Sequence, residues 1–227
     1  MPLPHFTPEL QLQTLFHLDS AGRIVGTREP NPMAGPLFAL VRSHTDCAWA
    51  VHRDLPTPVA DQLHALARTE PPVRDLSDAP AHAARYQALA GGRIDAGPAF
   101  TIPSDIATLD DIVIVTELLQ LEKYFRGWQA NEIAGCSPIL AIAEAGHAVS
   151  VCFCARRADI AAEAGVETAA AFRGRGFGGR VIAAWARAIS ASGRLPIYST
   201  SWSNTPSLAV ASKLGLAPCA SDWTLVR

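Results

Sequence analysis

Two carboxylates lie on one expected strand that leads directly into a glycine-rich turn. The stretch reads IAAEAGVETAAAFRGRGFGGRV, with Glu163 and Glu167 four residues apart. Side chains at that spacing face the same side of a regular strand. Apolar neighbours disfavour the charged form of a carboxylate and raise its pKa, which suits a general base. The alternatives are that a carboxylate binds a cationic substrate without moving a proton, or pairs with an arginine.

The turn after this strand has the composition of a phosphate-binding loop. Its glycines let the backbone approach a ligand closely, and the helix expected directly after it offers free N–H groups and a positive dipole end. Three arginines add positive charge. The residues are Arg173, Gly174, Arg175, Gly176, Phe177, Gly178, Gly179 and Arg180. The pattern suits a pyrophosphate, and a solvated turn with an arginine face is the simpler alternative.

The same glycines spell the dinucleotide pattern G-x-G-x-x-G at Gly174, Gly176 and Gly179. A nicotinamide site also needs an acidic residue about 20 residues beyond the loop to bind the ribose. The first carboxylate after Gly179 is Asp222, near the end of the chain. A Walker A loop is excluded as well, because Arg-Val follows Gly179 where Lys-Ser or Lys-Thr is required. The glycines therefore indicate another phosphate-bearing ligand.

Hydrophobic periodicity predicts the elements that position these residues. In the second half we expect strands at 111–117, as a pair within 138–156, and at 160–172, 195–202 and 222–227, with helices at 118–133, 181–190 and 205–214. In the first half we expect a loop at 28–36, strands at 37–43 and 47–53, and helices at 57–69 and 79–92. Residues 93–105 look irregular and are expected to form a linker or an edge strand.

Composition limits the function classes. The chain has 227 residues, 49% of them hydrophobic, and a net charge of −2. That length can bury a sizeable core, and the charge gives no reason to expect nucleic acid or an anionic membrane surface as a partner. No apolar run approaches the roughly 18 residues of a membrane span, and the first residues lack the features of a signal peptide. We therefore expect a cytoplasmic protein.

The cysteines do not predict a metal site. There are five, an odd number, and none forms a C-x-x-C pair. Cys152 and Cys154 share one face of an expected strand, where a metal or redox pair is conceivable. Packing as small apolar residues in a reducing compartment is the better interpretation. We therefore expect no bound metal.

Two separated motifs resemble those of the GNAT superfamily of acetyl-CoA-dependent acyltransferases. The first places Arg173, Gly176 and Gly178 in the family's loop pattern, with the aromatic Phe172 ahead. The second is the stretch NTPSLAVASKLGL, which begins at Asn204 and contains the family's Lys-Leu-Gly. The motifs flank a helix and a strand, as the family's order requires. The resemblance covers roughly residues 106–227.

The resemblance implies an α/β (α+β) GNAT fold, with a central, mixed, mostly antiparallel sheet flanked by helices. Residues 106–227 would form the N-acetyltransferase domain and residues 1–105 an N-terminal α/β region of unclear role. That region is expected to pack on the acyltransferase half and shape the acceptor cleft. It could equally be a degenerate second domain or the surface of a homodimer.

The resemblance also implies roles for individual residues in binding acetyl-CoA. Backbone groups of Val166, Glu167 and Thr168 would pair with the pantetheine arm, and residues 173–179 would hold the pyrophosphate. Asn204 and Ser207 would reach the pantetheine from the next helix. Capping of that helix is the alternative role for Asn204, and the two roles are compatible.

The expected activity is transfer of an acetyl group to an amine of a small molecule or a protein. Glu167 is the favoured base and Glu163 the second candidate. Many family members carry a proton-donating tyrosine where this chain has Ala211. The hydroxyl would then come from elsewhere, and the candidates are Tyr198, Ser199, Thr200, Ser201 and Ser212. The alternative function is a GNAT-like module that binds CoA without turnover.

Overall fold

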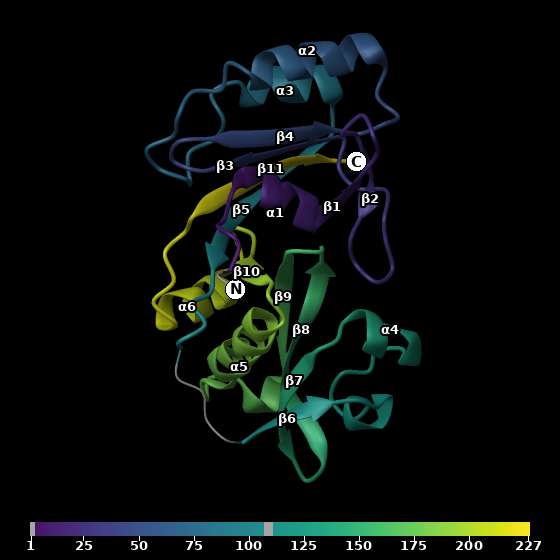
Figure 1. Ribbon diagram of the computed structural model, residues 1–227, viewed down its shortest axis with the longest axis vertical. Helices are drawn as coiled ribbons and strands as arrows, with labels where there is room; N and C mark the ends of the chain where they lie inside the picture. Colours follow the sequence, from purple (N-terminus) through teal and green to yellow (C-terminus); the bar gives the residue numbers. More distant parts are fainter. Residues whose placement is uncertain (1–2, 107–110) are drawn as a thin grey trace.

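The computed structural model describes residues 3–106 and 111–227, and its centre is one sheet of nine strands in the order β4-β3-β11-β5-β10-β9-β8-β7-β6 (Figure 1). The strands are β3 (Phe38–Arg42), β4 (Cys47–Val51), β5 (Arg93–Thr101), β6 (Ile112–Val115), β7 (Ile139–Glu144), β8 (His147–Arg157), β9 (Ala161–Thr168), β10 (Leu195–Ser199) and β11 (Ala220–Val226). Strands β9 and β10 pair in parallel, and the other neighbours pair antiparallel. A separate hairpin joins β1 (Phe16–Leu18) and β2 (Ile24–Thr27). This sheet confirms the predicted fold class.

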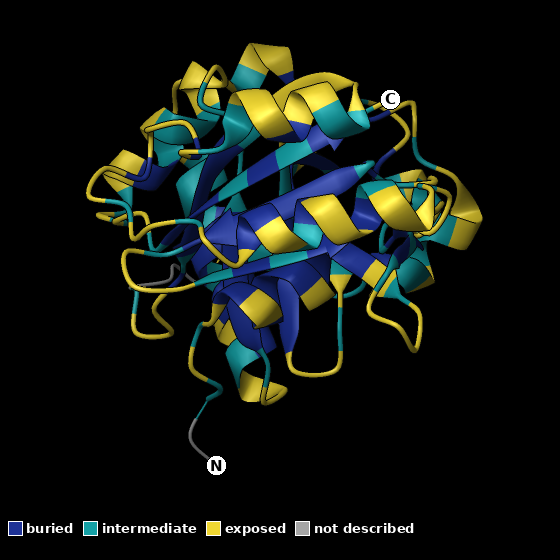
Figure 2. Ribbon diagram, turned by 90° about the horizontal axis from the view of Figure 1, so that it is seen from above, coloured by how far each residue is buried: buried dark blue, intermediate teal, exposed yellow. Residues whose placement is uncertain are grey.

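Helices cover both faces of the sheet (Figure 2). They are α1 (Pro8–Leu15), α2 (Thr57–Ala67), α3 (Ala83–Ala90), α4 (Ala130–Gly135), α5 (Phe177–Ala191) and α6 (Thr205–Lys213). Alternate residues of a strand point to opposite faces: Ala162 packs in the same core cluster as α5, whereas Ala161 packs with Leu10 of α1. Helices α5 and α6 therefore cover one face, here called the α5 face, and α1 covers the opposite face, here called the α1 face.

The segment 93–105 is not a linker or an edge strand, as the sequence suggested. Residues Arg93–Thr101 form β5, which lies inside the sheet between β10 and β11. Gly97 and Pro98 break the alternation that normally reveals a strand. The glycine is required because a Cβ at position 97 would lie 1.6 Å from the carbonyl oxygen of Thr200. The irregular sequence thus reflects a close crossing of two backbones.

The single helix predicted at 118–133 is also wrong. The structure has a short 3-10 helix at Leu118–Gln120, then turns, and then α4. The Gln120 side chain accepts from the backbone N–H groups of residues 116 and 117, and the Glu132 side chain accepts from the N–H of Gln129. These bonds mark two separate helix starts. Leu121 and Phe125 are nevertheless buried, so their apolar pattern reflected burial without a continuous helix.

The first hundred residues and the rest of the chain share this sheet. Strand β5 pairs with β10 on one side and with β11 on the other, and β11 also pairs with β3. The C-terminal strand therefore lies between two strands of the N-terminal region (Figure 1). The boundary expected near residue 105 separates two stretches of sequence whose strands interleave.

Candidate active site

A cavity of about 940 Å³ opens where β9 and β10 separate on the α5 face. The two strands pair only at Leu195↔Ala161, Pro196↔Ala162 and Ile197↔Glu163. Beyond these pairs, the residues from Ala164 to Thr168 pair with β8 alone among the described strands. One side of β9 therefore presents backbone groups to the cavity instead of to a neighbouring strand.

The glycine-rich turn forms one end of this cavity. Gly174 and Gly176 have φ angles of 79° and 78°, a region that side chains with a Cβ strongly disfavour. Gly176 is the N-cap of α5, and open space surrounds the position that its Cβ would occupy. The first turn of α5 therefore begins at the cavity with its N–H groups free of intrahelical partners. Such a helix start is favourable for an anion.

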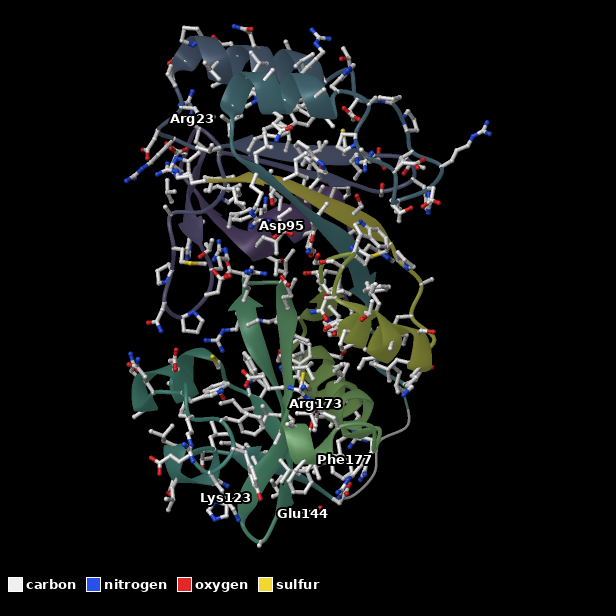
Figure 3. The ribbon with its side chains drawn as sticks, turned by 180° about the vertical axis from the view of Figure 1, so that it is seen from behind. Arg23, Asp95, Lys123, Glu144, Arg173 and Phe177 are labelled. Atoms are coloured by element: carbon white, nitrogen blue, oxygen red, sulfur yellow. The ribbon has the colours of Figure 1, made fainter. Side chains whose placement is uncertain are left out.

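The three arginines of the turn adopt different positions. The Arg173 side chain donates to the Thr168 carbonyl at 3.2 Å and lines the cavity beside α5 (Figure 3). Arg180 also lines the cavity and forms an ion pair with Asp111. Arg175 lies over the Phe172 ring, 5.0 Å from its centre, and approaches Glu144 at 3.8 Å. Two of the arginines thus contribute positive charge at the cavity itself.

The structure brings most of the predicted site residues together around this one cavity. Those that line it are Val166, Glu167, Thr168, Arg173, Gly174, Gly176, Phe177, Gly178, Gly179, Asn204 and Ser207. Arg175 and Glu163, which were also predicted, are not among its lining residues. The cavity is further lined by Ile106, Tyr124 and Phe125, for which the sequence carried no site signal.

Asn204 combines the two roles considered for it. Its Oδ1 atom accepts from the backbone N–H of Ser207 at 3.2 Å, so the side chain caps α6. Asn204 and Ser207 both line the cavity. The cap fixes the start of α6 beside the open side of β9, which places polar groups from both elements around the same space.

Glu167 lies at the cavity with a perturbed carboxyl group. Glu167 is exposed and is one of the residues that line the cavity, yet the surrounding protein removes part of the hydration of its carboxyl group and raises its pKa. A hydrogen bond with the Trp128 side chain opposes that rise. The Trp128 ring packs edge-on against Phe153, with 4.7 Å between centres. A carboxylate with a raised pKa at a cavity is suited to accept a proton.

Glu163 lies away from the cavity, in a buried ionic network. The residue is only 3% exposed. Its Oε1 atom accepts from Arg156 Nη1 at 3.0 Å and also from the Ser199 hydroxyl. Arg156 continues to Glu29, where Nε donates to Oε1 at 2.7 Å. The arginine pairing that the sequence left open for these glutamates is thus present at Glu163.

Asp222, which the sequence did not single out as a site residue, extends this network. It accepts from the Gln11 side chain at 3.0 Å. Burial and the nearby charge of Glu163 raise its pKa to about 7, while Gln11 and Arg156 act in the opposite direction. These residues are distant in the sequence and meet only in the folded structure. Glu29 and Arg156 are 127 positions apart, and Gln11 and Asp222 are 211 positions apart.

Within residues 3–106 and 111–227, no group of three or more His, Cys, Asp or Glu side chains could hold a metal ion. In the same part of the chain, no helix is both long and apolar enough to span a membrane. Cys152 and Cys154 are buried, and burial raises the pKa of both thiols. Both cysteines are in their thiol form and pack in the core beneath α5.

Comparison with known proteins supports the interpretation of the fold. Residues 141–223 match the family model of FR47-like proteins. A GNAT-family acetyltransferase from Colwellia psychrerythraea superposes with a TM-score of 0.50 at 14% identity, covering 79% of this chain and 76% of that one. A GNAT-family protein from Novosphingobium aromaticivorans has a TM-score of 0.49 at 21% identity and covers 59% of this chain.

The match with the Novosphingobium protein spans 64% of that chain, which is less than two thirds of its length. No curated protein sequence matches this chain. Residues 141–223 are therefore similar to FR47-like proteins, and the chain shares the fold of the GNAT-family acetyltransferase from Colwellia psychrerythraea.

Proposed function

We propose that this protein is an acetyl-CoA-dependent N-acetyltransferase that acts on an amine of a small molecule or a protein. One observation carries the proposal: a single cavity is bounded by the unpaired side of β9, the glycine turn and the start of α5. This combination suits an acyl-CoA, which carries an amide-containing arm and a pyrophosphate. The arm would pair with backbone groups of residues 166–168 in the manner of an added strand.

The turn is suited to the pyrophosphate for three physical reasons. Gly174 and Gly176 adopt backbone angles that bring N–H groups close to the cavity. The start of α5 adds free donors and the positive end of a helix dipole. Arg173 and Arg180 add positive charge at the lining. Asn204 and Ser207 would contact the arm from α6.

Acyl transfer to an amine requires a neutral amine and stabilisation of the carbonyl oxygen as charge develops. Glu167 would accept the proton of the attacking amine, directly or through a water molecule. A backbone N–H on the unpaired side of β9 would donate to the carbonyl oxygen. Acetyl-CoA supplies the activated acyl group, and the chain supplies its orientation and the transfer of protons.

Substitution of Glu167 tests the proposed base. Glu167→Gln keeps the size of the side chain and removes its ability to accept a proton. We expect kcat to fall by roughly 100-fold or more, with little change in the Kd of acetyl-CoA. The wild-type kcat should fall as the pH drops through the raised pKa of Glu167, because the base is then protonated. The variant should lose this acidic limb.

The assay is acetyl-CoA-dependent release of free thiol across a panel of primary amines over a range of pH. Glu9→Gln is the matched control, since Glu9 is exposed in the first turn of α1 and does not line the cavity. Unchanged turnover and pH dependence in Glu167→Gln would remove Glu167 as the base. Binding of acetyl-CoA with no thiol release by the wild type would favour the non-catalytic module.

A further inference from the structure

The structure sorts the five hydroxyl groups that could replace the proton donor missing at Ala211. Tyr198 lines the cavity. Ser199 is the next residue of β10 and points to the α1 face, where it donates to Glu163. Ser212 is exposed on α6 and does not line the cavity. Ser199 and Ser212 are thereby excluded from the site.

The other two hydroxyl residues lie beyond the end of β10. The Ser201 hydroxyl is bonded to that of Ser203 at 2.8 Å. The Thr200 backbone is held against β5, with its N–H donating to the Pro98 carbonyl at 3.2 Å. Neither residue lines the cavity. Of the five candidates, all within the described part of the chain, Tyr198 alone reaches the space between β9 and α6.

The small residue at position 211 leaves room for the Tyr198 ring. Ala211 and Tyr198 are 1% and 4% exposed and pack in the same core cluster. Tyr198 and Ser207 both line the cavity. Ser207 and Ala211 are four residues apart on α6 and so share one helix face. On its other side, Tyr198 stacks on Phe100, with 6.2 Å between ring centres. The Tyr198 ring therefore packs beside Ala211 of α6 and Phe100 of β5.

The phenol is held in its protonated form. Burial raises the pKa of Tyr198 above its ordinary value near 10, and a hydrogen bond with Ser207 opposes this only in part. A phenol that stays protonated at neutral pH is able to donate a hydrogen bond or a proton. Because Tyr198 lines the cavity, this protonated phenol lies beside the space where the thioester arm would bind.

We propose that Tyr198 is the proton donor to the departing thiolate. The inference rests on the proposed acetyl-CoA-dependent transfer. In the step, the amine nitrogen bonds to the acyl carbon, the carbon–sulfur bond breaks, and its electron pair goes to sulfur. The amine proton goes to Glu167, and the Tyr198 hydroxyl proton goes to sulfur to give CoA thiol. The proton on Glu167 then returns to the Tyr198 phenolate by exchange through solvent, so that atoms and charge balance.

The test uses Tyr198→Phe, which removes the hydroxyl and keeps the ring that packs on Phe100. We expect kcat to fall by roughly 100-fold, the lower end of the range for general acids, because a thiolate is already a tolerable leaving group. The KM for acetyl-CoA should change little. Ser212→Ala is the matched control, because Ser212 carries an exposed hydroxyl on α6 that does not line the cavity, and kcat should be unchanged.

A second measurement does not depend on turnover. The pKa of the CoA thiol bound to the full-length protein is followed by ultraviolet absorbance of the thiolate. A hydrogen bond from Tyr198 favours the thiolate, so the bound thiol should have a lower pKa in the wild type than in Tyr198→Phe. Equal thiol pKa values together with unchanged kcat in the variant would overturn the role of Tyr198. A wild type that neither binds CoA nor releases thiol would instead refute the proposed function, and this inference with it.

Discussion

Residues 106–227, produced without the first 105 residues, should not form a stable folded domain, although both recognisable motifs are present in that fragment. The reason lies in the strand order. Every residue of β11 from Ala220 to Val226 pairs with β5, and β11 pairs on its other side with β3. Both partners belong to the deleted part. The fragment would therefore retain β11 without either neighbour and leave one side of β10 unpaired.

The deletion also opens the core. Phe100 and Ile102 from the β5 segment pack in the same cluster as Val181 and Trp185 of α5. Burial of one large apolar side chain contributes about 1.5–3 kcal/mol, while whole domains are stable by only about 5–15 kcal/mol. The fragment would lose these side chains, two strand neighbours and the packing of α1 on β9. The combined loss of stabilising free energy is more than the fragment can tolerate.

Circular dichroism and thermal unfolding test this expectation. The fragment should show no cooperative transition, whereas the full chain should unfold in one step. Addition of a separate 1–105 fragment should restore a transition if the two parts assemble. A cooperative, native-like transition of 106–227 alone would contradict the account and would support a boundary at residue 105 between independent domains.

Gly176→Trp should abolish acetyl-CoA binding, with affinity reduced at least about 100-fold, or about 2.7 kcal/mol. Gly176 caps α5 with a φ of 78° and lines the cavity, and no atom lies within 4 Å of the position that its Cβ would occupy. A large side chain at this position would fill the space next to the free N–H groups of the helix. The ligand phosphates would then lose their approach to the backbone.

Gly176→Ala separates this blockage from backbone strain. Both substitutions place a Cβ in a left-handed conformation, at a cost of about 1–2 kcal/mol of folding stability. Only tryptophan adds bulk. We therefore expect Gly176→Ala to lose stability but to bind acetyl-CoA nearly as well as the wild type, as measured by calorimetric titration. Wild-type affinity in Gly176→Trp would refute the assignment of this turn as the pyrophosphate site.

The sequence could predict the local features of the cavity because they are encoded by neighbours in the chain. Glycines at positive φ, the start of α5 and the cap of α6 each depend on a few consecutive residues. The resemblance to the GNAT motifs implied that Arg173, Gly176 and Asn204 belong to one site, and all three line one cavity in the structure.

Features that depend on distant segments could not be predicted in this way. Residues 93–105 look irregular in the sequence, because the Thr200 backbone that crosses β5 at Gly97 lies a hundred residues away along the chain. The same limit applies to Glu163, whose partner Arg156 continues to Glu29 in the N-terminal region. The choice of Tyr198 among five hydroxyls required knowledge of which strand residues face α6.

The proposed function requires that the cavity between β9, α5 and α6 binds acetyl-CoA. The most direct measurement compares the thermal stabilisation of the full chain by acetyl-CoA, CoA, NAD and NADP. A ligand at 100 times its Kd stabilises the folded state by about 2.7 kcal/mol, which is readily seen as a rise in Tm. We predict that acetyl-CoA and CoA raise the Tm, whereas NAD and NADP do not. Stabilisation by NAD without stabilisation by acetyl-CoA would contradict the account.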